Sequence, residues 1–245
     1  MAAKRVAEKY GVDRLDLLFT DTKMEDEDLY RFIREAADSV GAPLTVIADG
    51  RTPWQVFHDV RFLGNTRIDP CSKILKRNLA DRWIEERFTP NEVTVYVGID
   101  WTEGHRYERM APRKLPYIYQ APLLEPPYLN KSEMLDALQG EGIKPPRLYG
   151  MGFPHNNCGG FCIKAGQGHF RLLHEQLPER YQYHEEQEQH IREVLGDVAI
   201  LRDRRGGTTK PMTLRTLRKR IESNGEVDRH DFGGCGCFLD DPEEA

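Results

Sequence analysis

The chain has 245 residues and a formal net charge of -5, which is enough sequence to bury the core of one α/β domain with a small appended module. No apolar run approaches the roughly 20 residues that a membrane-spanning helix needs, and the first residues lack the apolar centre of a signal peptide. The acidic balance gives no general attraction to nucleic acid, so we expect a cytoplasmic protein with no membrane partner.

Apolar periodicity predicts a helix over residues 2–10, closed by Gly11. Residues 15–25 then organise the chain: four apolar residues of strand type run into a polar turn, and an amphipathic helix follows over 25–40. In an open parallel sheet, ligands bind beyond the carboxyl ends of the strands. We therefore expect a bound nucleotide beside Thr20, Asp21, Thr22 and Glu25.

The rest of the chain alternates short strands with helices, which is typical of the α/β class. We expect strands at 44–47, 93–99 and 198–201, the second of them of the buried parallel type. We expect helices at 53–60, from 69 onward, and at 131–138, 170–177, 183–195 and 213–222. A proline-rich segment over 112–127 and a glycine-rich one over 150–168 are predicted to be irregular loops.

The five cysteines are odd in number and unevenly clustered, unlike the paired framework of a secreted disulfide-rich domain. In a reducing compartment, clustered thiols are more typical of metal ligation or redox chemistry. They are Cys71, Cys158, Cys162, Cys235 and Cys237.

The stretch LLFTDTKMEDEDLYRFIREAADSVGAPL resembles the second strand, turn and second helix of the phosphoadenosine phosphosulfate (PAPS) reductase family, a branch of the adenine-nucleotide alpha-hydrolase fold. The resemblance implies a Rossmann-like open parallel sheet over residues 1–168 that binds PAPS, adenylyl sulfate (APS) or ATP. A helical extension with a cysteine-rich tail would follow over 169–245. In that family, a strand and a Ser-Gly-Gly phosphate loop come first, and this sequence contains no such loop. We therefore expect a fragment, a misassigned start, or a first strand supplied by another chain.

The segment DPCSKILK places Cys71 near a helix N-terminus flanked by lysine, where the helix dipole and the positive charge favour the thiolate. This suits metal ligation or nucleophilic chemistry, and the alternative is a small buried helix residue. The segment resembles the family's Cys-Cys-x-x-x-x-Lys element, with Ser72 in place of the second cysteine. The resemblance implies that Cys71 ligates an iron–sulfur cluster, and that Lys73 and Lys76 stabilise the anionic leaving nucleotide.

In HNNCGGFC, three residues separate Cys158 from Cys162, and the glycines allow the backbone to wrap so that both sulfurs face one metal. The pair resembles the family's Cys-x-x-Cys, one residue longer, which implies a 4Fe-4S cluster. Zinc bound by four thiolates is the rival metal, and a disulfide or two free thiols is the alternative without metal.

In the tail sequence GGCGC, one glycine separates two thiols. Such thiols are suited to complete a metal site or to act as a mobile nucleophile. It resembles the C-terminal Cys-Gly arm of PAPS and APS reductases, although the acidic residue, leucine and histidine of that motif are absent. The resemblance implies that Cys235 attacks the sulfate sulfur, and it leaves Cys237 as a metal ligand beside the other three cysteines.

In GIDWTEGHR, Arg106 offers a planar fork of donors suited to phosphate or sulfate, and Glu103 can hold it in place or accept from the nucleotide. The segment resembles the family's Gly-x-Arg…Glu/Gln…Arg element, with Asp100 replacing an arginine. The alternative is a surface Glu–Arg pair.

Three functions follow. The first is an adenine-nucleotide-dependent oxidoreductase of sulfur metabolism that reduces APS or PAPS with a thioredoxin-like electron donor. The second is an ATP-dependent iron–sulfur enzyme that thiolates tRNA or DNA, which the basic helix at 213–222 favours. The third is an inactive nucleotide-binding or cluster-holding subunit. Each of these three functions is compatible with a homo-oligomer.

Overall fold

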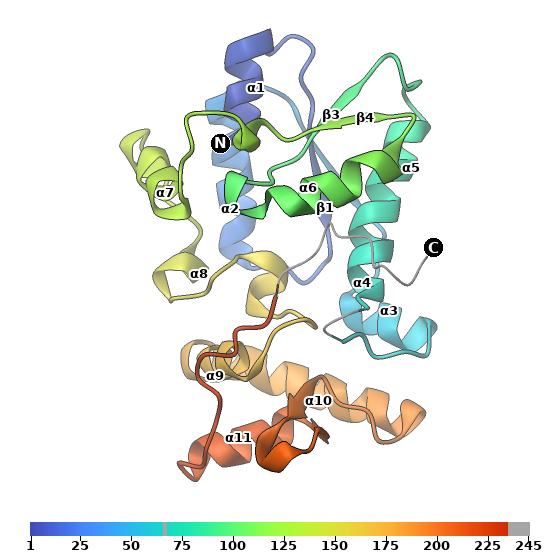
Figure 1. Ribbon diagram of the computed structural model, residues 1–245, viewed down its shortest axis with the longest axis vertical. Coiled ribbons are helices and arrows are strands. Elements are labelled where there is room, and N and C mark those ends of the chain that lie inside the picture. The colour runs from blue at the N-terminus through green and yellow to red at the C-terminus, as the bar shows by residue number, and fades with distance from the viewer. Residues whose placement is uncertain (66–67, 235–245) are drawn as a thin grey trace.

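The computed structural model describes residues 1–65 and 68–234 of a mixed α/β protein (Figure 1), so Cys235 and Cys237 lie outside the described residues. The parallel strands and most helices of the first half form one end of the molecule, and the helices between residues 167 and 222 form the other. No helix within the described part of the chain is both long enough and apolar enough to cross a bilayer.

The first strand pair matches the sequence prediction closely. Strand β1 (Leu17–Asp21) runs parallel to β2 (Leu44–Ala48), and α2 (Glu27–Val40) makes the crossover between them. The helix begins at Asp26, whose carboxylate accepts from the backbone N–H of Asp28, and ends at Gly41 with φ of 77°. This places residues 20–22 at the carboxyl end of the strand, as expected.

The second strand pair differs from the prediction. Strand β3 covers only Thr94–Tyr96 and is half-buried, so the expected long buried strand is wrong in length and burial. Its parallel partner β4 (Ile118–Gln120) lies in the proline-rich segment, where no strand was expected. The prolines at 116 and 122 flank β4 and leave its three backbone N–H groups intact, which is why a strand can form there.

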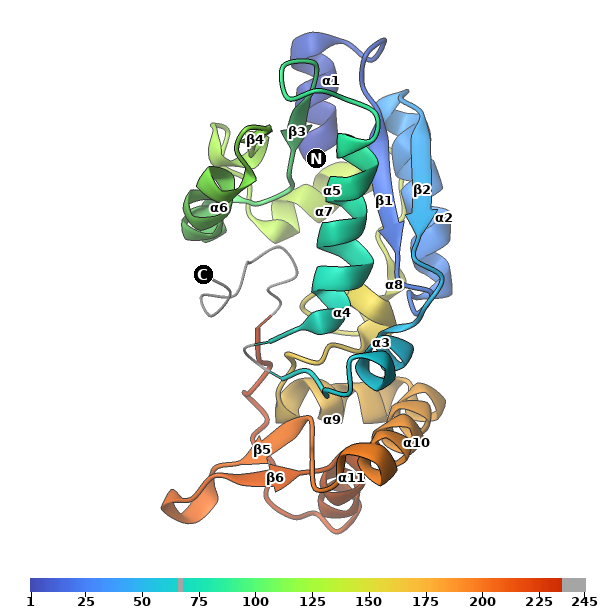
Figure 2. The same ribbon diagram turned by 90° about the vertical axis from the view of Figure 1, so that its right-hand side faces the viewer.

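Within the described residues, β1 pairs only with β2 and β3 only with β4, so the parallel strands form two separate pairs. Figure 2 shows the pairs on either side of α5 (Asn78–Glu85). That helix contacts β1, and its Asp81 carboxylate accepts from the Tyr119 hydroxyl on β4. Helix α1 (Ala2–Tyr10), predicted with the same bounds, packs against both α2 and β3. The two parallel strand pairs are therefore joined by helices, and not by backbone hydrogen bonds between strands.

The helix that carries Cys71 contains a turn of π-helix. It begins as α4 (Pro70–Ser72), continues as the π-helix η1 (Lys73–Arg77), and ends as α5. The wider turn, closed by Asn78 N–H donating to the Lys73 carbonyl, buries Leu75, Lys76 and Arg77 together. An ideal α-helix would spread three successive residues around its axis, and single π-turns occur frequently at functional sites.

One hydrophobic core continues across residue 168. It joins α3 (Pro53–Asp59) and residues 148–165 to α9 (Gln167–Gln176), α10 (Pro178–Leu195) and α11 (Leu214–Glu222). Trp54 Nε1–H donates to His184 Nδ1 at 3.0 Å, and the His184 ring stacks on Phe161 at 4.1 Å. Burial lowers the pKa of His184 to about 3, so this ring is neutral and packs as an aromatic group beneath the cysteine loop.

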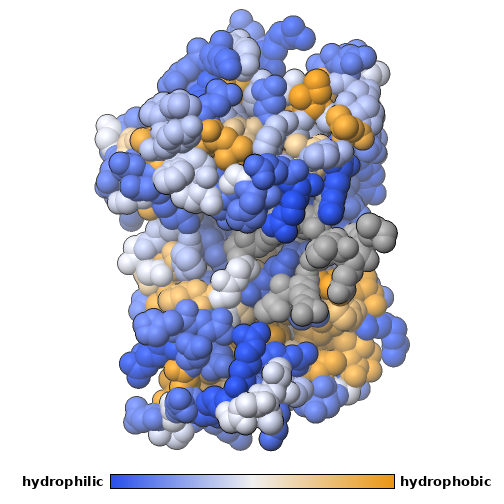
Figure 3. All heavy atoms as spheres, in the orientation of Figure 1, coloured by the Kyte–Doolittle hydropathy of each residue, from blue (hydrophilic) through white to orange (hydrophobic). Residues whose placement is uncertain are grey.

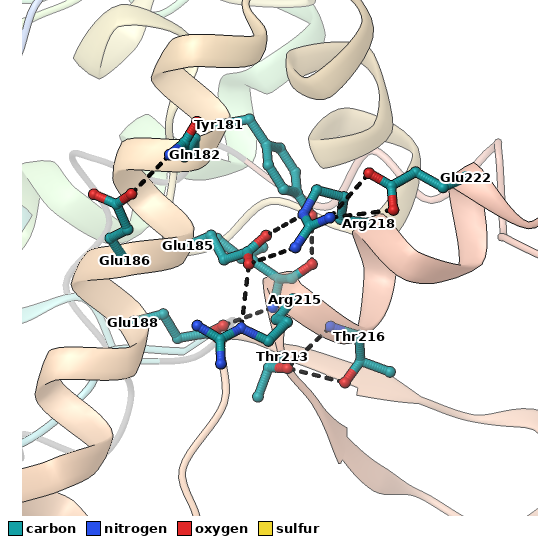
Figure 4. Close-up of polar contacts among 11 residues, drawn as sticks. Tyr181, Gln182, Glu185, Glu186, Glu188, Thr213, Arg215, Thr216, Arg218 and Glu222 are labelled. Carbon is teal, nitrogen blue, oxygen red and sulfur yellow. Dashed lines mark hydrogen bonds and ion pairs between the residues drawn. The ribbon is translucent and has the colours of Figure 1, made fainter.

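Helices α10 and α11 are also joined by a polar network (Figure 4). Glu185 accepts from Arg215 and Arg218 at the edge of the interface. Glu188 is fully buried, and its two oxygens accept from the backbone N–H groups of Ile200, at 3.0 Å, and Leu214, at 2.6 Å. One carboxylate therefore ties α10 to the start of α11 and to the segment that precedes β5 (Leu201–Asp203).

The strand expected over 198–201 is displaced, because β5 covers Leu201–Asp203. It pairs antiparallel with β6 (Lys210–Met212), a strand that was not expected. Two further helices, α7 (Lys131–Gly140) and α8 (Arg147–Gly150), lead into the cysteine loop. The face in Figure 3 is mostly hydrophilic, and hydrophobic residues gather in the region of α3 and α10, where Val60 and Phe62 just beyond α3 are exposed.

Candidate functional site

Three cysteines from distant parts of the chain line one pocket. Cys71 comes from the helix that begins at Pro70, and Cys158 and Cys162 come from the glycine-rich loop. Thr22, which directly follows β1, lines the same pocket, as do Asp69, Ser72, Lys76 and Lys164. The structure thus brings together three of the four predicted metal ligands, one predicted nucleotide-binding residue and one predicted catalytic lysine.

The cysteine loop is held in an unusual backbone conformation. Cys158, Gly159 and Gly160 have φ of 47°, 62° and 86°, so three successive residues are left-handed, and the first of them is not glycine. Arg180 Nη1–H donates to the Gly159 carbonyl at 2.5 Å, and His169 Nε2 lies 2.8 Å from the Gly160 carbonyl. The turn directs the segment that carries both cysteines into the pocket.

Glu25 organises the wall of the pocket. Its buried carboxylate accepts from Thr22 Oγ1 at 3.0 Å and from the Cys158 backbone N–H at 2.6 Å, and it lies 3.5 Å from Lys76 Nζ. Glu25 therefore connects the end of β1, the cysteine loop and the π-helix. The sequence predicted a nucleotide contact, and no observation tests that role.

Two buried lysines line the pocket with the cysteines. Asp69 accepts from Arg77 Nη2 at 3.4 Å and from Lys164 Nζ at 3.3 Å, and Lys76 pairs with Glu25. Lys76 and Lys164 line the pocket together with the three cysteines, and positive charge close to a thiol favours its thiolate form. The sequence prediction missed Asp69 and Lys164. One signal could have indicated Lys164: it stands two residues after Cys162, within an apolar and glycine-rich run.

Two predicted nucleotide-binding residues contact other groups. Thr20 lies in β1 and does not line the pocket. Asp21 accepts from the Tyr30 hydroxyl and from the Lys23 N–H, each at 2.8 Å. Burial would raise the pKa of Asp21, but these hydrogen bonds and the Lys23 charge outweigh it, so the pKa is lowered and the carboxylate is ionised.

The other predicted anion-binding residues lie outside the pocket lining. Glu103 accepts from Arg106 Nη1 at 2.5 Å, where α6 (Gly104–Met110) follows β3, so the expected pair exists. The buried Arg106 Nε has no hydrogen-bond partner among residues 1–65 and 68–234. Lys73, in the π-helix, is likewise not part of the lining.

The described residues do not form a complete metal site. Among the described residues, no three His, Cys, Asp or Glu side chains lie close enough to hold a metal ion. The donor set nevertheless suits iron–sulfur or zinc, because three thiols share one cation-rich pocket. A four-thiolate site needs one more thiol, and the remaining cysteines are Cys235 and Cys237.

No protein-family model and no curated protein matches this sequence.

Replacing Gly159 by alanine is expected to destabilise the cysteine loop. The new Cβ would lie 1.7 Å from Arg180 Nη1 and 2.9 Å from the Met24 carbonyl, at a φ that side chains rarely adopt. We expect the free energy of unfolding to fall by about 2 kcal/mol or more. The control is Gly206→Ala, with a similar φ of 64° and nothing within 4 Å of its Cβ. Equal midpoints of thermal unfolding for the two variants would contradict the tight packing of this loop.

Proposed function

We propose that this protein is an adenine-nucleotide-dependent iron–sulfur enzyme of sulfur metabolism, of the kind that PAPS reductases represent. The observation that carries the proposal is the convergence of Cys71, Cys158 and Cys162 on one pocket directly beyond the carboxyl end of β1. Ligands of parallel α/β proteins bind at this end of the strands. A redox or sulfur-binding group and a nucleotide would thus meet in one place.

An iron–sulfur cluster fits the donor set better than three structural thiols do. Two glycines and one cysteine of the loop adopt the left-handed conformation where the loop enters the pocket, and Lys76 and Lys164 line the same pocket. The cluster would be held by the three pocket cysteines and one tail thiol. When bound, it would supply electron transfer or a site for sulfur.

The proposed reaction is reduction of APS or PAPS. A thiolate of this chain attacks the sulfate sulfur, a sulfur–sulfur bond forms, and the bond from sulfur to the phosphate oxygen breaks, so that the adenosine phosphate leaves with the electron pair. Lys76, with Lys73 and Arg106, would stabilise the negative charge of that leaving group. A thioredoxin-like dithiol would then reduce the enzyme S-sulfonate and release sulfite.

The test is anaerobic purification of the full chain, assay of iron and acid-labile sulfide, and incubation with APS, PAPS or ATP. We expect about four irons per chain, and sulfite plus an adenosine phosphate when a dithiol donor is present. Conversion of ATP to AMP and pyrophosphate would instead identify the ATP-dependent thiolation of tRNA or DNA. Absence of both iron and turnover would overturn the proposal. Zinc in place of iron would identify the cysteine site as a zinc site and not an iron–sulfur cluster.

A second candidate is a nucleotide-binding or cluster-holding subunit completed by a strand from another polypeptide. The separation of the parallel strands favours it: in Figure 2 the order across the view is β4, β3, β1, β2, and β1 and β3 each have one partner among the described residues. An inserted parallel strand would join all four into one sheet. This candidate predicts bound iron but no turnover, and turnover gained when a strand with a Ser-Gly-Gly loop is fused ahead of residue 1. Turnover by the chain alone would exclude it.

A further inference from the structure

The hairpin that β5 and β6 form extends away from α10 and α11 (Figure 2). We call residues 201–212 the basic hairpin. Residues 204–211 are all exposed, and the chain reverses through Gly206 and Gly207, with φ of 64° and 72°. At the base of the hairpin, Leu201 lies opposite Met212, and both side chains are buried. The hairpin is therefore anchored in the core, and its tip lies in solvent.

The basic hairpin and α11 concentrate positive charge in an acidic protein. Residues 201–220 contain eight lysines or arginines and a single aspartate, a formal net charge of +7, whereas the whole chain carries -5. Salt screens charges over about 8–10 Å. A phosphate close to the hairpin is therefore attracted by the local charge, and the acidic remainder of the chain acts on it only weakly.

Half of these eight cations are held by carboxylates. Asp203 accepts from Arg205 and Arg220, and Glu185 accepts from Arg215 and Arg218, with Glu222 and Glu226 as further partners. The other four are exposed and form no ion pair with any residue in 1–65 or 68–234: Arg202, Arg204, Lys210 and Lys219. Because Asp203 is already occupied, the charge of Lys210, its partner across the hairpin, stays available to a ligand. We call Arg202, Arg204 and Lys210 the hairpin cations.

The composition of this surface indicates which kind of polyanion it fits. There is no Phe, Tyr or Trp between residues 201 and 226, and the apolar side chains of the hairpin base are buried. A lipid surface or a folded protein would require exposed apolar anchors, and a single-stranded nucleic acid would require aromatic rings for base stacking. Arginine, lysine and threonine side chains are instead typical of contacts to the phosphates of a duplex.

We propose that the basic hairpin is a docking surface for duplex DNA, which it binds through the phosphates without reading the base sequence. The major groove of B-DNA is about 12 Å wide and admits a two-stranded β-ribbon. The major groove of duplex RNA is too deep and narrow for side chains to enter. None of the hairpin cations lines the cysteine pocket, so this inference does not rest on the proposed reaction.

The first experiment measures binding of the full chain to a fluorescently labelled DNA duplex of about 20 base pairs by anisotropy, between about 50 and 200 mM salt. Each phosphate that a cation neutralises contributes about -0.9 to the slope of log K against log salt, so four cations predict a slope between about -3 and -4. Affinity should thus fall roughly 100-fold over this range. No binding at the lowest salt, with about 100 μM protein, would overturn the proposal.

The second experiment replaces all three hairpin cations by glutamine. The control removes the same charge from exposed cations in other parts of the chain, through Arg14→Gln, Arg34→Gln and Lys144→Gln. We expect the hairpin variant to bind the duplex at least about tenfold more weakly, with a slope shallower by about 3, and the control to bind like the wild type. Equal weakening in the two variants would overturn the assignment to the hairpin. The midpoint of thermal unfolding should stay unchanged in both, because every substituted side chain is exposed.

Competition distinguishes duplex DNA from other polyanions. Unlabelled duplex DNA, duplex RNA, single-stranded DNA and vesicles that contain phosphatidylserine are each titrated against the labelled complex. We expect duplex DNA to compete at the lowest concentration. Stronger competition by either RNA, single strands or vesicles would overturn the choice of duplex DNA. Because no nucleotide, iron or turnover enters these measurements, their failure is distinct from failure of the proposed function.

Discussion

Replacing Cys162 by serine is expected to lower the iron content from about four atoms per chain to fewer than about one. Cys162 is 7% exposed and lines the pocket beside Cys71 and Cys158. Serine nearly preserves the side-chain volume but removes the soft thiolate that iron–sulfur clusters require, so the fold should survive while the cluster does not. The same loss is expected for Cys71→Ser and Cys158→Ser, measured by iron and labile sulfide after anaerobic purification.

The matched control is Ser72→Ala. Ser72 lines the same pocket, is 4% exposed, and stands where the resembling family has a second cysteine. We expect this variant to retain its iron, and loss of iron would identify the Ser72 hydroxyl as a ligand. Wild-type iron content in a folded Cys162→Ser protein would contradict the proposed metal site.

The largest expected loss of stability is for Glu188→Ala. The change removes the acceptor of two buried backbone N–H groups, those of Ile200 and Leu214. Each buried group left without a partner costs about 1–3 kcal/mol, so we expect the free energy of unfolding to fall by about 2–6 kcal/mol. Chemical denaturation measures the change. Glu186→Ala is the control, because Glu186 is exposed on the same helix and should change stability by less than about 0.5 kcal/mol.

The same carboxylate predicts a pH dependence of stability. Burial raises the pKa of Glu188 to about 7, against 4.5 for an ordinary glutamate, while the two backbone N–H groups and Arg192 act in the opposite direction and Glu185 adds to the rise. Between these two pKa values the folded protein binds the proton more tightly than the unfolded chain does. The contribution to stability is therefore full below about pH 4.5 and is lost as pH rises through 7.

Denaturation at pH 5, 6 and 7.5 tests this, with Glu188→Gln as the variant that cannot titrate. Over that range, we expect the wild-type protein to lose up to about 3 kcal/mol relative to the variant. Parallel pH profiles would show that Glu188 stays ionised throughout and that its two hydrogen bonds outweigh its burial.

Local patterns in the sequence gave most of the helices and the first parallel pair. The apolar spacing in α2, the Asp26 cap and the glycine at 41 are each read within a few neighbouring residues, so no distant contact is needed to place them. The short strands were harder. Three residues give too little alternation to distinguish β4, β5 or β6 from loop, and their pairing partners decide whether they form.

For the candidate site, the order of the residues was enough to indicate which of them could carry chemistry, because thiols, glycines and an Asp-Pro helix start are local features. Which of these residues come into contact depends on how distant segments pack. Packing brought Cys71 to the cysteine loop and Lys164 into the pocket lining, and it left Arg106 outside that lining. It also brought Glu25 into contact with the Cys158 backbone. Burial of a side chain and contact between distant segments both depend on how the whole chain packs. A pattern of a few neighbouring residues does not contain that information.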